Sequence, residues 1–538
     1  MNSLFKVAGK PFFSIGGQTH NSSTCTKETL ERSWQAAETL GLNTIAAPVT
    51  WERVEPVEGQ FCFDQIDWIV DGARKRGLKA VLLWFGTWKN GTSHYVPEWV
   101  KTDKKRFAWC KSQNGAYARI LSPLGAETLQ ADKRAFARVM EYVKSINEDN
   151  IVVAVQVENE PGLCGTPRDY SAPANSLFNG TVPDDLVAWV KSTADCYIRD
   201  VWVKQGSRET GSWKEVFGPV DCAEIFSAYY VSGYCNSVAE AGRTVYPEMP
   251  LYCNVWLGEM YNRVAGVDFP SGGATCHMID LWKMRTPSID VIAPDIYLQD
   301  LRTYESVCAA YKRQDNLLYI PESGPSVMNA LNVMTMIAEK ELTGIHSFGI
   351  DSCVDDSGAL RPSCKEWAHT VKILTAMKPL LEKYIGTGKV YAVAQYEGCS
   401  TINYDFGDYL GRVACFNPNG NAFAENPGFM DTFHSNPEDY KVRGKGLIID
   451  AGDGVFYIAG EGFRLTFTRK DDIDLMSSGV RASTFHNGRH GEYLSVQEGW
   501  FDENGEFVAN RSRCGDETDF GIWAHWDVGV IRVVMDRT

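Results

Sequence analysis

Residues 151–162 read IVVAVQVENEPG, an apolar run that ends abruptly in acidic and amide side chains. Its first five residues are β-branched or alanine, which is typical of a strand covered on both faces, as in a parallel sheet. Pro161 and Gly162 stop the strand directly after Glu160. The stretch therefore predicts a buried parallel strand that presents Asn159 and carboxylates at its carboxyl end.

A second stretch, LLYIPESG at residues 317–324, has the same design and delivers Glu322 after a short apolar run. The carboxyl ends of parallel barrel strands meet on one face, where active sites are built. Two glutamates at such strand ends indicate glycoside hydrolysis by an acid/base and a nucleophile. We interpret Glu160 as the acid/base and Glu322 as the nucleophile, against the plainer reading of a surface acid and a turn residue.

Between residue 12 and about residue 380, strand-like runs alternate with amphipathic helical stretches. Eight such units predict a (β/α)8 TIM barrel with long insertions after its strands, which would wall a pocket on the carboxyl-end face. The expected strands are 12–17, 43–49, 79–85, 151–157, 251–255, 289–294, 317–320 and 344–350. The expected helices are one that starts after Thr26 and ends near residue 40, then 64–76, 132–146, 184–203, 223–242 and 364–377.

The pattern changes near Gly386 to short alternating runs separated by Gly, Asn and Asp turns, such as residues 390–394, 446–450, 455–459 and 528–534. This pattern is typical of an antiparallel β-sandwich. We therefore expect a catalytic barrel over residues 1–385 and a C-terminal β-sandwich domain over residues 386–538.

Composition limits the function classes. A net charge of −15 over 538 residues argues against a nucleic-acid or anionic-membrane partner. The N-terminus lacks an apolar leader, no run of 18 apolar residues occurs, and the 15 cysteines form no C-x-x-C pair. We expect a cytoplasmic protein with free thiols, and the sequence is compatible with a homo-oligomer.

Several motifs together resemble retaining β-galactosidases of clan A, in glycoside hydrolase families 35 and 42. They are VENEPG at 157–162, WERVEPVEGQFCFD at 51–64, IPES at 320–323, GGQTHNSS at 16–23, LLWFGTWKN at 82–90 and GDET at 515–518. The last three resemble the bacterial branch with a C-terminal β domain. The resemblance spans nearly the whole chain.

The resemblance implies that Asn159 holds the sugar 2-hydroxyl, that Glu160 is the acid/base and that Glu322 is the nucleophile. Relatives often carry Glu where this chain has Gln18. An amide offers both a donor and an acceptor there, so the hydrogen bond to one sugar hydroxyl is expected to differ from that in relatives with Glu.

Other pocket candidates follow from their positions at strand ends. Tyr297 could orient the nucleophile or simply pack, and Trp84 could stack on a sugar or fill the core. His346 is expected to be a satisfied barrel histidine, and His486 with His490 lacks a third ligand, so no metal and no cofactor are expected. The expected substrate-binding set is Gln18, Asn21, Trp84, Trp88, Lys89, Asn159, Trp256 and Tyr297.

Three functions compete at this point. The leading hypothesis is an exo-acting retaining β-galactosidase that acts on a galactoside oligosaccharide or glycoside. Another clan A specificity, such as β-glucosidase, is the nearest alternative because Gln18 and the insertions could reshape the pocket. A non-catalytic carbohydrate-binding barrel is the third, and the presence of both glutamates argues against it.

Overall fold

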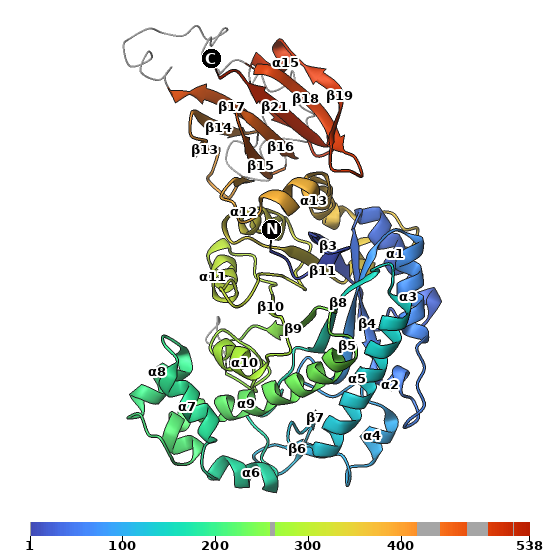
Figure 1. Cartoon of the computed structure of the whole chain (residues 1–538), viewed down its shortest axis with the longest axis vertical. Coiled ribbons are helices and arrows are strands. Elements are labelled where there is room, and N and C mark those ends of the chain that lie inside the picture. Colours follow the sequence, from blue (N-terminus) through green and yellow to red (C-terminus); the bar gives the residue numbers. More distant parts are fainter. Residues whose placement is uncertain (1, 259–263, 417–441, 471–492, 520, 538) are drawn as a thin grey trace.

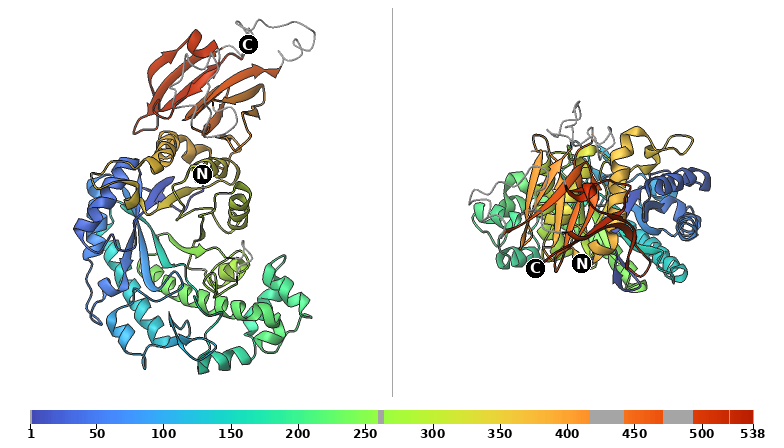
Figure 2. Two further views of the ribbon diagram at one scale, coloured as in Figure 1. Left: turned by 180° about the vertical axis from the view of Figure 1, so that it is seen from behind. Right: turned by 90° about the horizontal axis from the view of Figure 1, so that it is seen from above.

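The computed structural model describes residues 2–258, 264–416, 442–470, 493–519 and 521–537. A ring of parallel strands and covering helices forms the larger part, and two antiparallel sheets stand on one side of it (Figure 1). The helix α13 (Lys365–Tyr384) lies where the two parts meet. Figure 2 gives the same arrangement from behind and from above.

Seven parallel strands form the central sheet, in the order β10-β9-β8-β5-β4-β3-β11. The curled parallel sheet with its outer helices confirms the predicted TIM barrel. Its strands are β3 (Ser14–Gln18), β4 (Thr44–Thr50), β5 (Lys79–Lys89), β8 (Val152–Asn159), β9 (Leu251–Trp256), β10 (Val291–Asp295) and β11 (Gly344–Phe348).

The segment predicted as the seventh strand, residues 317–320, closes the ring without forming a strand. It is joined to its neighbours by two isolated parallel bridges, Ile320 with Ile345 and Ser323 with Ile296. Pro321 has no N–H to give to a ladder, which explains why the pairing stays local. The prediction of a regular strand here is wrong, although its place between β10 and β11 is right.

The barrel helices agree with the expected order but differ in their bounds. Thr26 caps α1, as predicted, by accepting a hydrogen bond from the backbone of Thr29. The expected helix 184–203 is two helices, and the expected helix 223–242 is part of a longer one. The helices are α1 (Lys27–Leu40), α2 (Trp51–Val54), α3 (Asp64–Lys75), α4 (Glu98–Thr102), α5 (Ala126–Ile146), α6 (Ala172–Asn179), α7 (Asp184–Ser192), α8 (Tyr197–Lys204), α9 (Trp213–Val245), α10 (Ile279–Arg285), α11 (Leu301–Tyr311), α12 (Val327–Glu339) and α13.

Short elements complete the barrel. The insertion after β5 holds a two-stranded hairpin, and another hairpin lies at the N-terminus. They are β1 (Lys6–Val7) with β2 (Lys10–Pro11), β6 (Trp109–Lys111) with β7 (Tyr117–Leu121), and the 3-10 turns η2 (Ile350–Cys353) and η3 (Pro362–Cys364).

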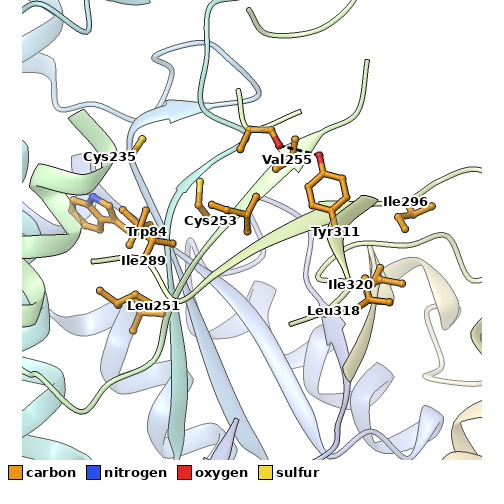
Figure 3. Close-up of a cluster of buried hydrophobic side chains, with 14 of the residues drawn as sticks. Trp84, Cys235, Leu251, Cys253, Val255, Ile289, Ile296, Tyr311, Leu318 and Ile320 are labelled. Atoms are coloured by element: carbon orange, nitrogen blue, oxygen red, sulfur yellow. Dashed lines mark hydrogen bonds between the residues drawn. The ribbon is translucent and has the colours of Figure 1, made fainter. Parts of the chain in front are cut away.

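Side chains that alternate along the strands belong to two apolar clusters, one on each face of the sheet. Inside the ring, Val81, Leu83 and Phe85 of β5 pack with Tyr252 and Tyr319. Outside it, the strands pack against the helices, and Figure 3 shows part of that layer around Trp84, Cys253 and Tyr311. This alternation decides which strand-end residues can reach the pocket.

His346 fills the bore of the barrel as a satisfied buried histidine, as predicted. Its Nε2 lies 2.8 Å from Ser14 Oγ and its Nδ1 lies 3.0 Å from Tyr319 Oη. Burial lowers its pKa to about 3. It is therefore neutral and takes no part in the pocket.

After α13 the chain forms two antiparallel sheets around a common core, which confirms the predicted β-sandwich. Val393, Ile448 and Phe456 of one sheet pack on Val413 and Leu465 of the other. The first sheet holds β12 (Val390–Ala394), β15 (Lys445–Gly452), β16 (Val455–Glu461), β21 (Val530–Met535), β18 (Tyr493–Phe501) and β19 (Phe507–Arg513). The second holds β13 (Thr401–Asp405), β14 (Tyr409–Cys415), β17 (Phe463–Arg469) and β20 (Ile522–Ala524), and a short helix α15 (Asp516–Asp519) precedes β20.

The two parts share a core. Leu447, Ile449, Ala459 and Val530 of the first sheet belong to the same buried cluster as the outer layer of the barrel. The division of the chain at residue 385 therefore stays a prediction. None of the helices in the described ranges has the length and apolar character needed to cross a bilayer.

Candidate active site

A cavity of about 380 Å³ opens at the carboxyl ends of the barrel strands. This volume lies in the range of small-molecule sites, which is roughly 300–1,000 Å³. Its walls come from strand ends and the loops that follow them. The lining residues are Asn21, Lys89, Asn90, Glu160, Trp256, Leu257, Asp295, Tyr297, Leu298, Glu322 and Phe348.

Glu160 enters this cavity directly after β8 ends at Asn159. Its backbone is left-handed, with φ of 44°, a conformation that non-glycine residues rarely adopt. The backbone N–H of Glu160 donates to Asn254 Oδ1 at 2.8 Å, which helps to hold this turn. Strain of this kind is found where a site needs a side chain aimed in one direction.

Glu322 lies in the same cavity and is held by side chains from several strand ends. Tyr297 donates its hydroxyl to Oε2 at 2.8 Å, and Gln18 donates Nε2 to Oε1 at 2.8 Å. Asn159 Nδ2 approaches Oε1 at 3.4 Å. A carboxylate accepts hydrogen bonds only, so these donors fix the orientation of an ionised Glu322.

Asp295 is the third carboxyl group in the cavity, and sequence reasoning missed it. It is the last residue of β10 and is 4% exposed. One oxygen each from Glu160, Asp295 and Glu322 lie within 4.8 Å of one another. Residues 291–295 read VIAPD, an apolar strand that ends in an acid, and that signal could have found it.

The crowding of the carboxyl groups shifts their proton affinities. Burial, followed by the charge of Glu322, raises the pKa of Glu160 to about 7. Burial, followed by the charges of Glu322 and Glu160, raises the pKa of Asp295 well above its usual range. A carboxyl group with a pKa near neutrality is suited to general acid/base catalysis.

Lys89 supplies a positive charge to the cavity. Its Nζ donates to Asn159 Oδ1 at 2.8 Å, which orients the amide so that Nδ2 faces Glu322. Its charge lowers the pKa of Glu160 and of Asp295 and so opposes the effect of burial. Lys89 therefore both positions Asn159 and moderates the acidic cluster.

Six of the predicted residues line the cavity, namely Asn21, Lys89, Glu160, Trp256, Tyr297 and Glu322. Gln18 and Asn159 are fully buried beneath it and contact Glu322. Their contacts within the site make them supports of that carboxylate. Further residues that the sequence reasoning did not single out are Asn254, Leu257, Leu298 and Phe348.

Trp84 and Trp88 do not reach the cavity, so the prediction that they bind sugar is wrong. Trp84 is 1% exposed and donates Nε1 to Asp132 at 2.9 Å, while Trp88 is fully buried against Tyr234. The pairing of β5 with β8 is irregular between Trp84 and Lys89. Both rings lie on the helix side of the sheet, and Lys89 faces the pocket instead.

Glu158 is a further carboxyl group near the end of β8, and it lies outside the cavity. It is fully buried, and it accepts hydrogen bonds from the backbone N–H groups of Thr87 and Trp88 at 3.2 and 2.7 Å. Its side chain lies beside Asp132 of α5, between the sheet and the helices.

The three carboxyl groups of the cavity are close enough to share a cation. An acidic cluster alone does not define a metal site, and burial, the first cause that raises the pKa of both Glu160 and Asp295, favours neutral carboxyl groups over the ionised ones that a cation requires. We assign no metal here. His486 and His490 lie outside the described residues.

Known proteins resemble this chain at two levels. At the level of class, the barrel resembles solved β-galactosidases from Rahnella sp. R3 and from G. stearothermophilus. The Rahnella enzyme is 14% identical, with a TM-score of 0.50, and the match covers 71% of this chain and 58% of that enzyme. The G. stearothermophilus enzyme, a GH42 β-galactosidase, is 15% identical, with a TM-score of 0.50, and the match covers 72% of this chain and 59% of that enzyme. Such likeness supports the fold.

At the level of family, residues 19–256 match the family model described as beta-galactosidase, Glyco_hydro_42. A β-galactosidase of Xanthomonas manihotis is 28% identical over 201 residues, which is 33% of this chain and 32% of that protein. The chain thus matches about a third of the length of this curated relative. The predicted resemblance to family 42 is confirmed, and the resemblance to family 35 stays a prediction.

The C-terminal part has a match of its own. Residues 368–525 match a domain of unknown function, DUF5597. The family 42 match ends at Trp256, before Asp295, Tyr297 and Glu322. The roles of those three residues therefore rest on the geometry of the site.

Proposed function

We propose that this protein is a retaining, exo-acting β-galactosidase with Glu160 as acid/base and Glu322 as nucleophile. One observation carries the proposal. Glu160, with its pKa raised to about 7 by burial and by the charge of Glu322, faces a second carboxylate that Tyr297 and Gln18 hold in place. Retaining glycosidases use such a pair at a carboxyl separation of about 5–5.5 Å.

In the first step, Glu322 attacks the anomeric carbon while protonated Glu160 gives its proton to the departing oxygen. The glycosyl–enzyme bond forms as the glycosidic bond breaks. In the second step, ionised Glu160 takes a proton from water, and that water releases the sugar from Glu322. One oxygen of Glu160 lies within 4.8 Å of one oxygen of Glu322, a spacing nearer to the roughly 5–5.5 Å of retaining pairs than to the roughly 6.5–9.5 Å of inverting pairs, which supports retention.

The shape and walls of the cavity support exo action on a single terminal sugar. Its volume of about 380 Å³ suits one sugar unit, and Trp256 with Tyr297 offers aromatic surface at the wall. Lys89 and Asn21 contribute polar groups that can hold hydroxyl groups. The substrate class in this proposal is a terminal β-galactoside.

A second candidate is a clan A β-glycosidase of another specificity, such as β-glucosidase. The position of Gln18 favours this candidate. Gln18 lies beneath the cavity, and its amide N–H donates a hydrogen bond to Glu322. The charged acceptor that relatives often carry there is absent, so one hydrogen bond to a sugar hydroxyl is altered. Discrimination between epimers depends on such bonds.

The experiment is a panel of nitrophenyl β-glycosides assayed for kcat/KM in EDTA. Faster hydrolysis of the β-galactoside than of the β-glucoside, unchanged by EDTA, is the expected result. A preference for the β-glucoside would favour the second candidate. Absence of turnover with every glycoside, together with measurable sugar binding, would instead support a carbohydrate-binding barrel.

We also propose a cytoplasmic location. Apart from Cys276, the cysteines are free thiols in the structure, and eight of them are buried. Proteins of oxidising compartments commonly use cysteines in disulfides. Fractionation of the cells that express the protein would test this, and recovery outside the cytoplasm would contradict it.

A further inference from the structure

Asp295 is tied to Glu160 through an asparagine. Asn254 of β9 accepts from the Glu160 backbone N–H with Oδ1 at 2.8 Å and donates Nδ2 to Asp295 Oδ2 at 2.7 Å. The other oxygen of the carboxyl group, Oδ1, is buried and has no donor within the described ranges. This oxygen can therefore bear a proton and donate a hydrogen bond to the Glu160 carboxylate.

We propose that Asp295 is a positioning residue whose neutral carboxyl group donates a hydrogen bond to the Glu160 carboxylate. This inference rests on the proposed function. It assigns to the third carboxyl group of the cavity a role distinct from those of the acid/base and the nucleophile.

The charges around Asp295 favour its neutral form. One oxygen each of Glu160 and Glu322 lies within 4.8 Å of an oxygen of Asp295, and the charge of Lys89 opposes their effect on its pKa. A hydrogen bond from the Asp295 carboxyl group to Glu160 would raise the pKa of Asp295 and lower that of Glu160. Among the described residues, its charge also raises the pKa of Tyr252, Cys253, Tyr297 and Tyr319.

The role follows from the two steps of the reaction. When Glu160 gives its proton to the departing oxygen, it becomes a buried anion next to Glu322. The Asp295 O–H then donates to that anion and stabilises it until water returns a proton to Glu160. Asp295 keeps its own proton throughout, so each step balances without it.

Two variants of Asp295 distinguish a neutral side chain that donates a hydrogen bond to Glu160 from an ionised side chain that acts through its charge. In Asp295→Asn, Asn254 Nδ2 still requires an acceptor, so the amide oxygen takes the place of Oδ2 and the amide N–H₂ takes the place of Oδ1. The donor to Glu160 is thereby kept. In Asp295→Ala the donor is lost. Asp290→Asn is the matched control, because Asp290 directly precedes β10 at its opposite end and contacts Arg243 and the Leu251 N–H.

The test has two readouts. One is the alkaline limb of the pH profile of kcat/KM, and the other is the ¹³C NMR titration of the Glu160 carboxyl carbon, assigned by its loss in Glu160→Gln. Asp295→Asn should keep the midpoint of the parent enzyme. Asp295→Ala should raise the midpoint by about 1–2 units, because a hydrogen bond to a charged group changes an equilibrium roughly 10- to 100-fold. Asp290→Asn should leave both readouts unchanged.

A downward shift in Asp295→Asn would show that Asp295 is ionised in the parent enzyme and would overturn the inference. An unchanged midpoint in Asp295→Ala would do the same. If Asp295→Ala does not fold, Asp295→Asn decides alone. If the parent enzyme hydrolyses no glycoside, the proposed function fails, and the NMR titration still tests the contact.

Discussion

Two carboxyl pairs lie on either side of the same strand end. Glu158 and Asp132 meet between the sheet and the helices, whereas Glu160 and Asp295 meet in the cavity. Burial is the first cause that raises the pKa of all four groups. The two pairs therefore share the cause of their raised pKa values, but only the pair of Glu160 and Asp295 can be reached from the cavity.

The difference shows that a shifted pKa does not by itself mark a catalytic group. The Glu158 oxygens accept from backbone N–H groups, and the Asp132 oxygens accept from Trp84, Thr87 and Tyr234. Such contacts hold β5 against α5 and α9. The Glu160 carboxyl group lines a cavity where a substrate oxygen can enter. The same physical effect therefore serves packing in one place and, under the proposed function, chemistry in the other.

Removal of the proposed nucleophile should lower activity most. Glu322→Ala should lower kcat by on the order of 10⁵- to 10⁶-fold, the scale seen when a covalent nucleophile is deleted. Added azide should restore part of the turnover and give a product of inverted configuration, measurable by NMR. Asp132→Asn, in the other pair, should retain activity per folded molecule. Retained activity in Glu322→Ala would remove Glu322 from its role.

A matched pair of variants two positions apart tests the acid. Glu160→Gln should lose about 10²- to 10⁴-fold with poor leaving groups, which is the usual contribution of a general acid. It should lose far less with activated leaving groups, which need little protonation. Glu158→Gln should not change the dependence on the leaving group. Equal losses on both substrate types in Glu160→Gln would contradict the acid role.

The two tyrosines offer a smaller contrast. Tyr297 donates to Glu322, and Tyr234 donates to Asp132. Tyr297→Phe should lower kcat about 10- to 100-fold, since it removes a hydrogen bond to a charged group. Tyr234→Phe should leave kcat near that of the parent enzyme and change thermal stability instead. A reversed pattern would mean that the buried pair is coupled to catalysis.

The smallest expected effect concerns stability and pH. Burial, followed by the charge of Asp132, raises the pKa of Glu158 above its unfolded value, so the fold binds more protons than the unfolded chain. Stability should then fall as pH rises from the unfolded pKa toward the folded one, by up to about 1.4 kcal/mol per pH unit for one proton. Glu158→Gln, neutral at every pH, should show a flatter slope in urea unfolding from about pH 6 to about pH 8. An unchanged slope would show that Glu158 is ionised in the fold.

Most of the barrel could be predicted because its strands are buried on both faces and read as short apolar runs. Glu160 and Glu322 follow such runs directly, so their meeting on one face follows from the parallel order of the strands. Trp84 and Trp88 lie away from the cavity because the irregular pairing at the end of β5 decides which side chains face it. That irregularity depends on the neighbouring strand and leaves no local signal in the sequence.

Asp295 and Asn254 are site residues that the sequence does not single out. Each closes or interrupts a short apolar strand, and their importance arises from contact between strands that are separate in the sequence. The seventh segment was predicted as a strand because its apolar residues suit one. Pro321 and the two isolated bridges show how a sequence can supply a position in the ring without a ladder.

The core shared by the barrel and the first C-terminal sheet has a consequence for cooperativity. Leu447, Ile449, Ala459 and Val530 cover apolar surface of the barrel side, so a chain that stops at residue 385 would leave that surface open to water. The two parts should accordingly melt in a single transition, and the barrel expressed alone should aggregate. The β-sandwich would then act as an obligatory fold partner of the catalytic barrel and not as a removable module.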